Sequence, residues 1–133
     1  MRVLLSIKPE FAFKIFEGKK KYEFRKVIFK RMGITKVVVY ASAPVSMVIG
    51  EFEIADIIHD EIERLWQETN RYAGIDEAYF YQYFAERETG YAIKIREATL
   101  YENELCIKEY FGIAPPQSFA YVNSETRIST LKR

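Results

Sequence analysis

The pattern of apolar and polar residues along this 133-residue chain predicts more strands than helices. Short apolar runs rich in β-branched residues, and segments that alternate with a period of two, are typical of strands. In the longest of these segments, Gly50 is the expected position of a β-bulge. The segments that we expect to form strands are residues 2–8, 19–26, 36–41, 46–58, 89–95 and 98–107.

Three further segments have helical spacing. The apolar residues within 9–17 recur at that spacing, and Gly18 is a natural stop for this short helix. A second helix is expected to start at Asp60, and a third to cover residues 76–86. The third helix carries an aromatic stripe that we assign to the core, formed by Tyr79, Phe80, Tyr83 and Phe84.

The order of these elements favours an α+β fold. The helices fall after the first strand and in the middle of the chain, which suits a mixed sheet or a small barrel with helices covering its open side. The length allows one domain with one core, which we place at residues 1–122. The polar residues 123–133 are expected to form a flexible C-terminal tail.

Composition limits the location and the cofactors. Hydrophobic residues make up 49% of the chain, but no apolar run nears membrane-spanning length and no signal peptide is evident. We therefore expect a cytoplasmic protein with no membrane partner. The single cysteine, Cys106, excludes an intramolecular disulfide, and with the single histidine, His59, it is too little for a zinc site. We expect no metal and no cofactor, and we favour a monomer, although the sequence leaves the oligomeric state open.

Charge is segregated along the chain, although the formal net charge is only +1. Residues 19–36 contain eight Lys and Arg against one acidic residue, whereas residues 51–68 contain seven acidic residues against one Arg. Such a basic segment can form a phosphate-binding patch on a nearly neutral domain. Alternatively, the two segments neutralise each other in space.

The basic segment begins with residues 18–25, in which cations and one carboxylate alternate with two aromatic residues. With a side-chain period of two, Glu23 and Arg25 share one face of the strand, and Tyr22 and Phe24 share the other. The aromatic face can pack into a core. The charged face is either a binding or catalytic site beside a glycine turn, or a solvated ion pair that adds little stability.

The residues Gly18, Lys20, Glu23 and Arg25 fit the pattern GxKxxExR, which resembles the signature of the ASCH domain family. The resemblance implies a PUA-like mixed β-barrel of about five to seven strands, with a short helix after the first strand and two helices in the middle. It extends to about Val122, where the chain resembles the last strand of the family. Further blocks that resemble the family, in the expected order, are residues 6–9, 40–45, 50–54, 90–95 and 115–119.

On this resemblance we expect a domain that binds RNA or a modified nucleotide in a cleft built around the GxKxxExR motif. Arg25 offers a planar fork for a phosphate, a carboxylate or a base edge, and Glu23 could orient that fork or accept from an amine. The alternative is a structural Glu–Arg pair. The residues expected to line the cleft are Lys8, Gly18, Lys20, Lys21, Glu23, Arg25, Ser42 and Gln117. Further candidates are Ser6, Tyr40, Tyr91, Ser118 and Tyr121.

An enzymatic function is the alternative to a binding module. Some bacterial proteins similar to this fold are small amidohydrolases that remove acetyl from acetylated cytidine with a Lys, a Thr and a Glu. Lys20 matches the Lys, but Glu23 occupies the Thr position and no second Glu can be placed. Whether the chain is an enzyme therefore stays open. If it is one, Lys20 and Glu23 are the catalytic candidates, and a ribonuclease reaction would have to proceed without a His pair.

Overall fold

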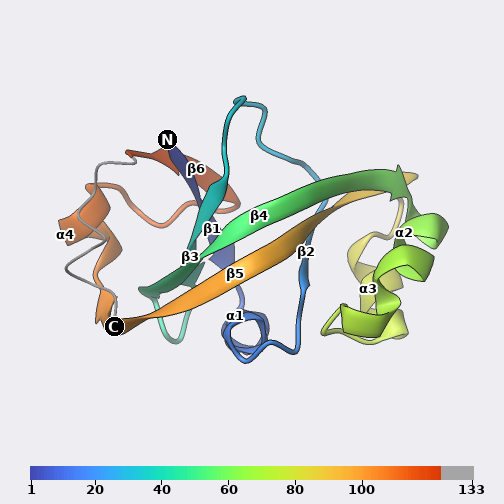
Figure 1. Cartoon of the computed structure of the whole chain (residues 1–133), viewed down its shortest axis with the longest axis horizontal. Coiled ribbons are helices and arrows are strands. Elements are labelled where there is room, and N and C mark those ends of the chain that lie inside the picture. The colour runs from blue at the N-terminus through green and yellow to red at the C-terminus, as the bar shows by residue number, and fades with distance from the viewer. Residues whose placement is uncertain (124–133) are drawn as a thin grey trace.

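A computed structural model describes residues 1–123 and folds them around one six-stranded sheet (Figure 1). The strands are β1 (Arg2–Ile7), β2 (Tyr22–Arg25), β3 (Lys36–Ala41), β4 (Met47–Glu61), β5 (Thr89–Leu105) and β6 (Phe119–Val122). Their order across the sheet is β2-β5-β4-β3-β1-β6. The β1–β3 pair is parallel and the other pairs are antiparallel, so the sheet is mixed.

The long antiparallel pair of β4 and β5 runs the length of the molecule (Figure 1). β5 is one continuous strand, although the sequence predicted two strands separated at residues 96–97. At that place only the register of its pairing with β4 shifts. Another register shift, between Val48 and Gly50, confirms the predicted bulge. Gly50 also permits close packing, because a Cβ there would lie 2.5 Å from the carbonyl oxygen of Thr99 and 2.6 Å from the ring of Phe16.

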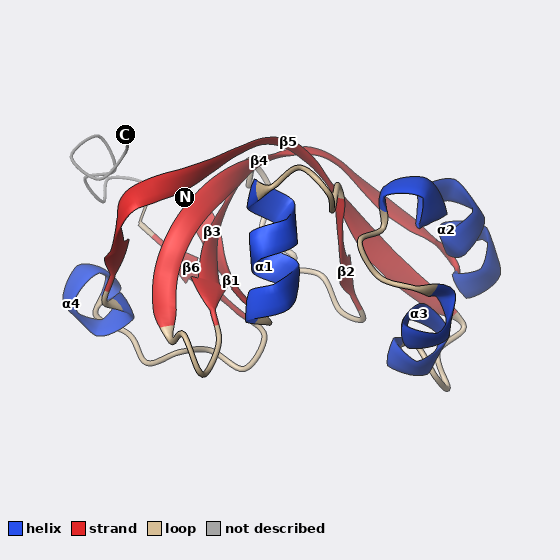
Figure 2. Ribbon diagram, turned by 90° about the horizontal axis from the view of Figure 1, so that it is seen from below, coloured by secondary structure: helices blue, strands red, loops and turns tan. Residues whose placement is uncertain are grey.

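Within the described residues the helices are α1 (Pro9–Phe16), α2 (Ile62–Thr69), α3 (Glu77–Tyr83) and α4 (Ile107–Phe111). A 3-10 turn, Asn70–Tyr72, follows α2. Figure 2 shows α1 beneath the arch of the sheet, α2 and α3 together at one end of β4 and β5, and α4 at the other end. None of these helices has the length and apolarity of a transmembrane segment.

Separate apolar clusters hold the helices in place. α1 buries Ala12 and Ile15 in the main cluster, which fills the space between that helix and the sheet. α2 and α3 pack on β2 and β5 through a second cluster that includes Phe24, Phe80 and Phe84. The aromatic stripe predicted for α3 is therefore divided. Its phenylalanines are buried in this cluster, whereas its tyrosines are only half-buried.

The sheet is not closed into the barrel that the family resemblance implied. Within residues 1–123, β2 and β6 are the two edges of the sheet, and they share no backbone ladder. Both strands are only four residues long, and the chain leaves the sheet after Arg25 to form the loop that leads to β3. An unpaired edge needs other partners, and here side chains supply them.

The predicted flexible tail lies outside the described residues, apart from Asn123. The division into a domain of residues 1–122 and a tail therefore stays a prediction.

Candidate functional site

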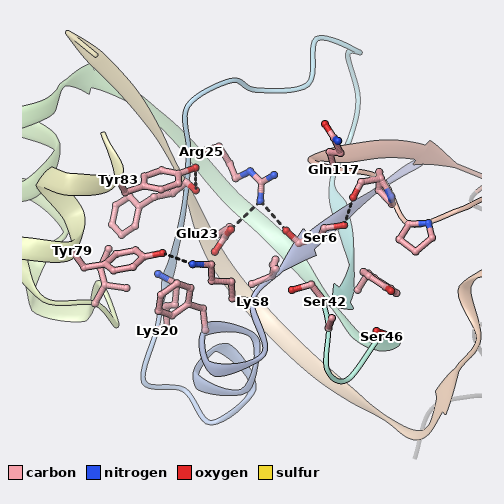
Figure 3. A pocket seen from close by; sticks show the side chains of 18 residues that line it. Ser6, Lys8, Lys20, Glu23, Arg25, Ser42, Ser46, Tyr79, Tyr83 and Gln117 are labelled. Atoms are coloured by element: carbon pink, nitrogen blue, oxygen red, sulfur yellow. Dashed lines mark hydrogen bonds and ion pairs between the residues drawn. The ribbon is translucent and has the colours of Figure 1, made fainter. Parts of the chain in front are cut away.

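A cavity of about 540 Å³ opens between α1, α3, β2 and the segment that precedes β6 (Figure 3). Its polar lining comes from Ser6, Lys8, Lys20, Glu23, Arg25, Ser42, Ser46 and Gln117. Its aromatic lining comes from Phe11, Phe24, Tyr40, Tyr79 and Tyr83. The volume is within the range of pockets that bind small molecules.

β2 directs two charged side chains into this cavity. Glu23 and Arg25 alternate with Phe24, which packs against α3, so the side-chain period places both on the cavity face as predicted. Glu23 is 6% exposed and Arg25 is 9% exposed. They are not the solvated surface pair of the simpler interpretation. A buried charge of this kind requires a partner and further hydrogen bonds.

Arg25 joins the two edges of the open sheet. Its Nη1 donates to Oε2 of Glu23 at 3.1 Å and to the carbonyl oxygen of Ser6 at 3.3 Å. Its Nη2 donates to the carbonyl oxygen and to Oγ of Ser118, at 3.1 and 2.8 Å. β2 is thereby tied to β1 and to the residue that precedes β6.

These contacts use most of the hydrogen-bonding capacity of Arg25. A guanidinium has five N–H groups, and the four hydrogen bonds to described residues leave only Nε–H for a ligand. The guanidinium of Arg25 is thus directed mainly at the protein itself. Oε1 of Glu23, in contrast, accepts no hydrogen bond from the described residues. The pair therefore keeps one acceptor, Oε1 of Glu23, and one donor, Nε–H of Arg25, that no described residue uses.

Lys20 lies in the cavity wall just before β2 and is only 2% exposed. Its Nζ donates to the carbonyl oxygen of Ala73 at 2.7 Å and lies 4.8 Å from the ring centre of Phe24. Burial lowers the pKa of this ammonium to about 8, the carboxylate of Glu23 acts in the opposite direction, and Lys14 adds to the lowering.

Gly74 makes room for Lys20. A Cβ at this position would lie 2.5 Å from Cβ of Lys20, and the backbone has a φ of +72° that glycine adopts readily. The packing of the buried Lys20 therefore requires a glycine at position 74.

Two tyrosines of α3 form the opposite wall and were missed as site residues. Tyr79 accepts a hydrogen bond from Nζ of Lys8 at 3.3 Å, and Tyr83 donates to the carbonyl oxygen of Phe24 at 3.2 Å. Burial raises the pKa of the Tyr83 hydroxyl, while the nearby Arg25 lowers it. The sequence held one signal for this wall. Tyr79 and Tyr83 form one pair of i, i+4 positions and Phe80 and Phe84 form another, so the hydroxyl-bearing rings share one face of the helix.

The structure separates two predicted site residues from the cavity. Gly18 is exposed and ends α1 with a φ of +79°. Lys21 places its ammonium 4.7 Å from the ring centre of Tyr72, outside the cavity lining. Of the three tyrosines considered for stacking on a base, Tyr40 lines the cavity, whereas Tyr91 and Tyr121 do not. The ring of Tyr91 stacks on His59 instead.

The remaining predicted residues do meet. Lys8, Lys20, Glu23, Arg25, Ser42 and Gln117 all line the one cavity. Ser6 fixes the rim opposite α3, because its Oγ donates to the carbonyl oxygen of Pro116 at 2.6 Å. Within residues 1–123 no group of His, Cys, Asp and Glu side chains is arranged to hold a metal ion.

The chain is similar to known proteins over most of its length. A family model described as the ASCH domain matches residues 5–111. The chain is 30% identical over 125 residues to a Zymomonas mobilis protein named ASCH domain-containing ribonuclease, a match that covers 92% of this chain and 84% of the relative. Large ribosomal subunit protein uL22 of Ureaplasma parvum serovar 3 is 24% identical over 123 residues, which are 90% of this chain but 39% of that protein.

Solved structures agree with the sequence matches. The crystal structure of ASCH from Zymomonas mobilis resembles this fold with a TM-score of 0.89 at 28% identity, and the match covers 99% of this chain and 96% of that chain. A crystal structure of a mutant of the same protein gives a TM-score of 0.90, also at 28% identity, over 99% of each chain.

We predict that Arg25→Met destabilises the fold by about 3–5 kcal/mol, because it leaves the buried carboxylate of Glu23 without its cation and removes a donor from the carbonyl groups of Ser6 and Ser118. The double variant Glu23→Gln with Arg25→Met should recover part of this loss, because the uncompensated charge is gone. Urea unfolding measures both. Lys26→Met is the matched control on an exposed neighbour and should stay within about 0.5 kcal/mol of the parent. A stable Arg25→Met protein would contradict the bridging role.

The lowered pKa of Lys20 predicts that the stability of the fold depends on pH. Its pKa in the folded state, about 8, is below its ordinary value of 10.5, so between these values the unfolded chain binds more protons. The free energy of unfolding therefore rises with pH in that window. Relative to Lys20→Met, the parent should gain about 1.5 kcal/mol between about pH 8 and pH 9.5, below the titration of tyrosine. Urea unfolding across this range checks the difference, and parallel profiles would show that Lys20 is not desolvated.

Proposed function

The chain belongs to the ASCH domain family, and from this premise we propose that it binds single-stranded RNA, or a nucleotide, in the cavity around Glu23. The observation that carries the proposal is the composition of the cavity. Buried charged groups at its floor stand beside aromatic rings on its walls. Unpaired bases are recognised by such rings, on which they stack, and by polar groups that bond their edges.

Exposed cations of the basic segment support this proposal. The Nζ of Lys26 lies 4.9 Å from the ring centre of Tyr83, which lines the cavity. Further along the same loop, the backbone N–H groups of Lys30 and Arg31 both donate to Oη of Tyr121 at 3.0 Å. The loop between β2 and β3 is thereby fixed to β6 with its basic residues exposed. Such cations attract a phosphate backbone.

The acidic segment does not neutralise this loop. Lys36 forms an ion pair with Glu51 at 3.6 Å, but Lys26, Lys30 and Arg31 form none with residues 51–68 in the described part of the chain. Asp60 and Glu61 instead pair with Arg64 inside their own segment. The segregation of charge seen in the sequence is therefore kept in space at this loop.

RNA cleavage is a second candidate function, which the 30% identical relative named as a ribonuclease favours. Lys20 and Glu23 line one cavity, and an amine with a pKa of about 8 can exchange a proton near neutral pH. The amidohydrolase alternative stays a prediction that none of the relatives named above favours.

We expect a labelled single-stranded RNA to bind with a strong dependence on salt, measured by fluorescence anisotropy. Replacing Lys26, Lys30 and Arg31 together by Gln should weaken binding and reduce the magnitude of the salt slope by about 2, since each lost phosphate contact contributes about 0.7 in a single strand. The charge-matched control replaces Arg87, Arg96 and Lys108 by Gln. Equal effects of the two triple variants, or no binding at low salt, would contradict the proposal.

If the chain cleaves RNA at this cavity, Lys20→Met and Glu23→Gln should each lower the cleavage rate about 100-fold or more, because each removes a proton-transfer group. Denaturing gels of an end-labelled single strand measure the rate, and melting curves show that the variants are folded. Lys19→Met, at an exposed neighbouring lysine, is the control. Cleavage that persists in both cavity variants would place the reaction elsewhere.

A further inference from the structure

We propose that the cavity selects bases that carry an exocyclic amino group, such as cytosine and adenine, over uracil. This inference rests on the proposed function and specifies its substrate. Its starting point is the hydrogen-bonding capacity that the protein leaves unused in the cavity lining. That capacity is one carboxylate oxygen of the buried Glu23 and the N–H groups of two lysines that line the same cavity, the buried Lys20 and the exposed Lys8.

The acceptor is Oε1 of Glu23. Oε2 is occupied by Nη1 of Arg25 at 3.1 Å, and the same guanidinium is held by Ser6 and Ser118. The carboxylate is therefore fixed in orientation, and only 6% of the residue is exposed. A carboxylate in such a pair accepts hydrogen bonds and donates none. A ligand atom that meets Oε1 must be a donor.

The donors are the ammonium groups of Lys20 and Lys8. Each ammonium has three N–H groups, and Lys20 uses one on the carbonyl oxygen of Ala73 while Lys8 uses one on Tyr79. Figure 3 shows both lysines on the same side of the cavity as Glu23. The lining thus brings an acceptor and donors into one cavity, and the charges of Lys20 and Glu23 are close enough to interact.

This order matches the edge of an amino-bearing base. Cytosine and adenine present an amino donor next to a ring nitrogen that accepts, and carboxylates are common acceptors from the cytosine amino group. Uracil presents a carbonyl oxygen and a ring N–H at the same two places. Its carbonyl oxygen would face the carboxylate without a proton between them, and the buried Glu23 would lose its contact with water as well.

A base fits the floor better than a phosphate does. Arg25, whose fork suits a phosphate, already donates four hydrogen bonds to the protein. The carboxylate of Glu23 repels an anion, and the rings of Tyr79 and Tyr83 offer stacking surface. The phosphate groups are left to the exposed cations outside, of which Lys26 is the first.

Glu23→Gln gives a sharp test, because Arg25 fixes which way the new amide points. Nη1 of Arg25 requires an acceptor, so the amide oxygen takes the place of Oε2 and the NH2 group takes the place of Oε1. The cavity then presents a donor where it presented an acceptor. The preference should move from cytosine toward uracil, whose carbonyl oxygen can accept from that NH2 group.

The experiment measures Kd by fluorescence anisotropy for two labelled hexamers, one of cytidine and one of uridine, with 2′-O-methyl riboses that block attack by the 2′-hydroxyl. For the parent protein we expect the cytidine hexamer to bind about ten-fold more tightly. For Glu23→Gln the ratio should fall to one or reverse. Glu102→Gln, at an exposed position of β5, should keep the parent ratio. Melting curves show that each variant is folded.

The outcomes separate this inference from the function beneath it. Equal affinity of the parent protein for both hexamers, with binding that the loop variant of Lys26, Lys30 and Arg31 still weakens, overturns the base selection alone. An unchanged preference in folded Glu23→Gln does the same. Absence of binding to both hexamers at low salt overturns the proposed function and this inference together. If Glu23→Gln does not fold, hexamers of adenosine and inosine test the parent protein, because they exchange the same two groups.

Discussion

The structure depends on one interaction, the bridge that the guanidinium of Arg25 forms between the two edges of an open sheet. β2 and β6 form no backbone ladder with each other, and three hydrogen bonds from the side chain of Arg25 connect β2 to Ser6 and Ser118 instead. A ladder at this place would close the sheet. A side chain leaves space beside it, and the cavity occupies that space. The buried guanidinium of Arg25 also needs the carboxylate of Glu23, since an uncompensated buried charge is strongly destabilising.

In the proposed function, the bridge also determines what the cavity can recognise. By using four of its own donors on the protein, Arg25 becomes a support for Glu23, whose second oxygen faces the cavity in a fixed direction. Lys20 adds a desolvated ammonium, placed by the carbonyl oxygen of Ala73 and by the room that Gly74 leaves. Preorganised polar groups of this kind favour a ligand with matching donors and acceptors. In the same proposal, the exposed cations around Lys26 attract the phosphates of the RNA whatever its bases are.

Much of this arrangement is predictable from local sequence. The alternation in residues 18–25 places Glu23 and Arg25 on one face, and the position of Lys20 before the strand frees it from that alternation. The mixed α+β fold and the bulge at Gly50 also follow from local patterns. What local patterns do not contain are contacts over long separations in the chain. Ser118 meets Arg25 across 93 residues and Tyr83 meets Phe24 across 59, so neither the open sheet nor the tyrosine wall could be foreseen. The position of Lys21 outside the cavity has the same cause, because its ammonium contacts the ring of Tyr72, which is distant in the chain.

The most direct test of this account is a crystal structure of the protein with a short cytidine-containing single strand. We expect a base inside the cavity, its amino group on Oε1 of Glu23, and its phosphate outside, toward Lys26. The four hydrogen bonds of Arg25 should be the same with and without RNA. A phosphate bound directly to Arg25, or RNA bound on another face with the cavity empty, would contradict it.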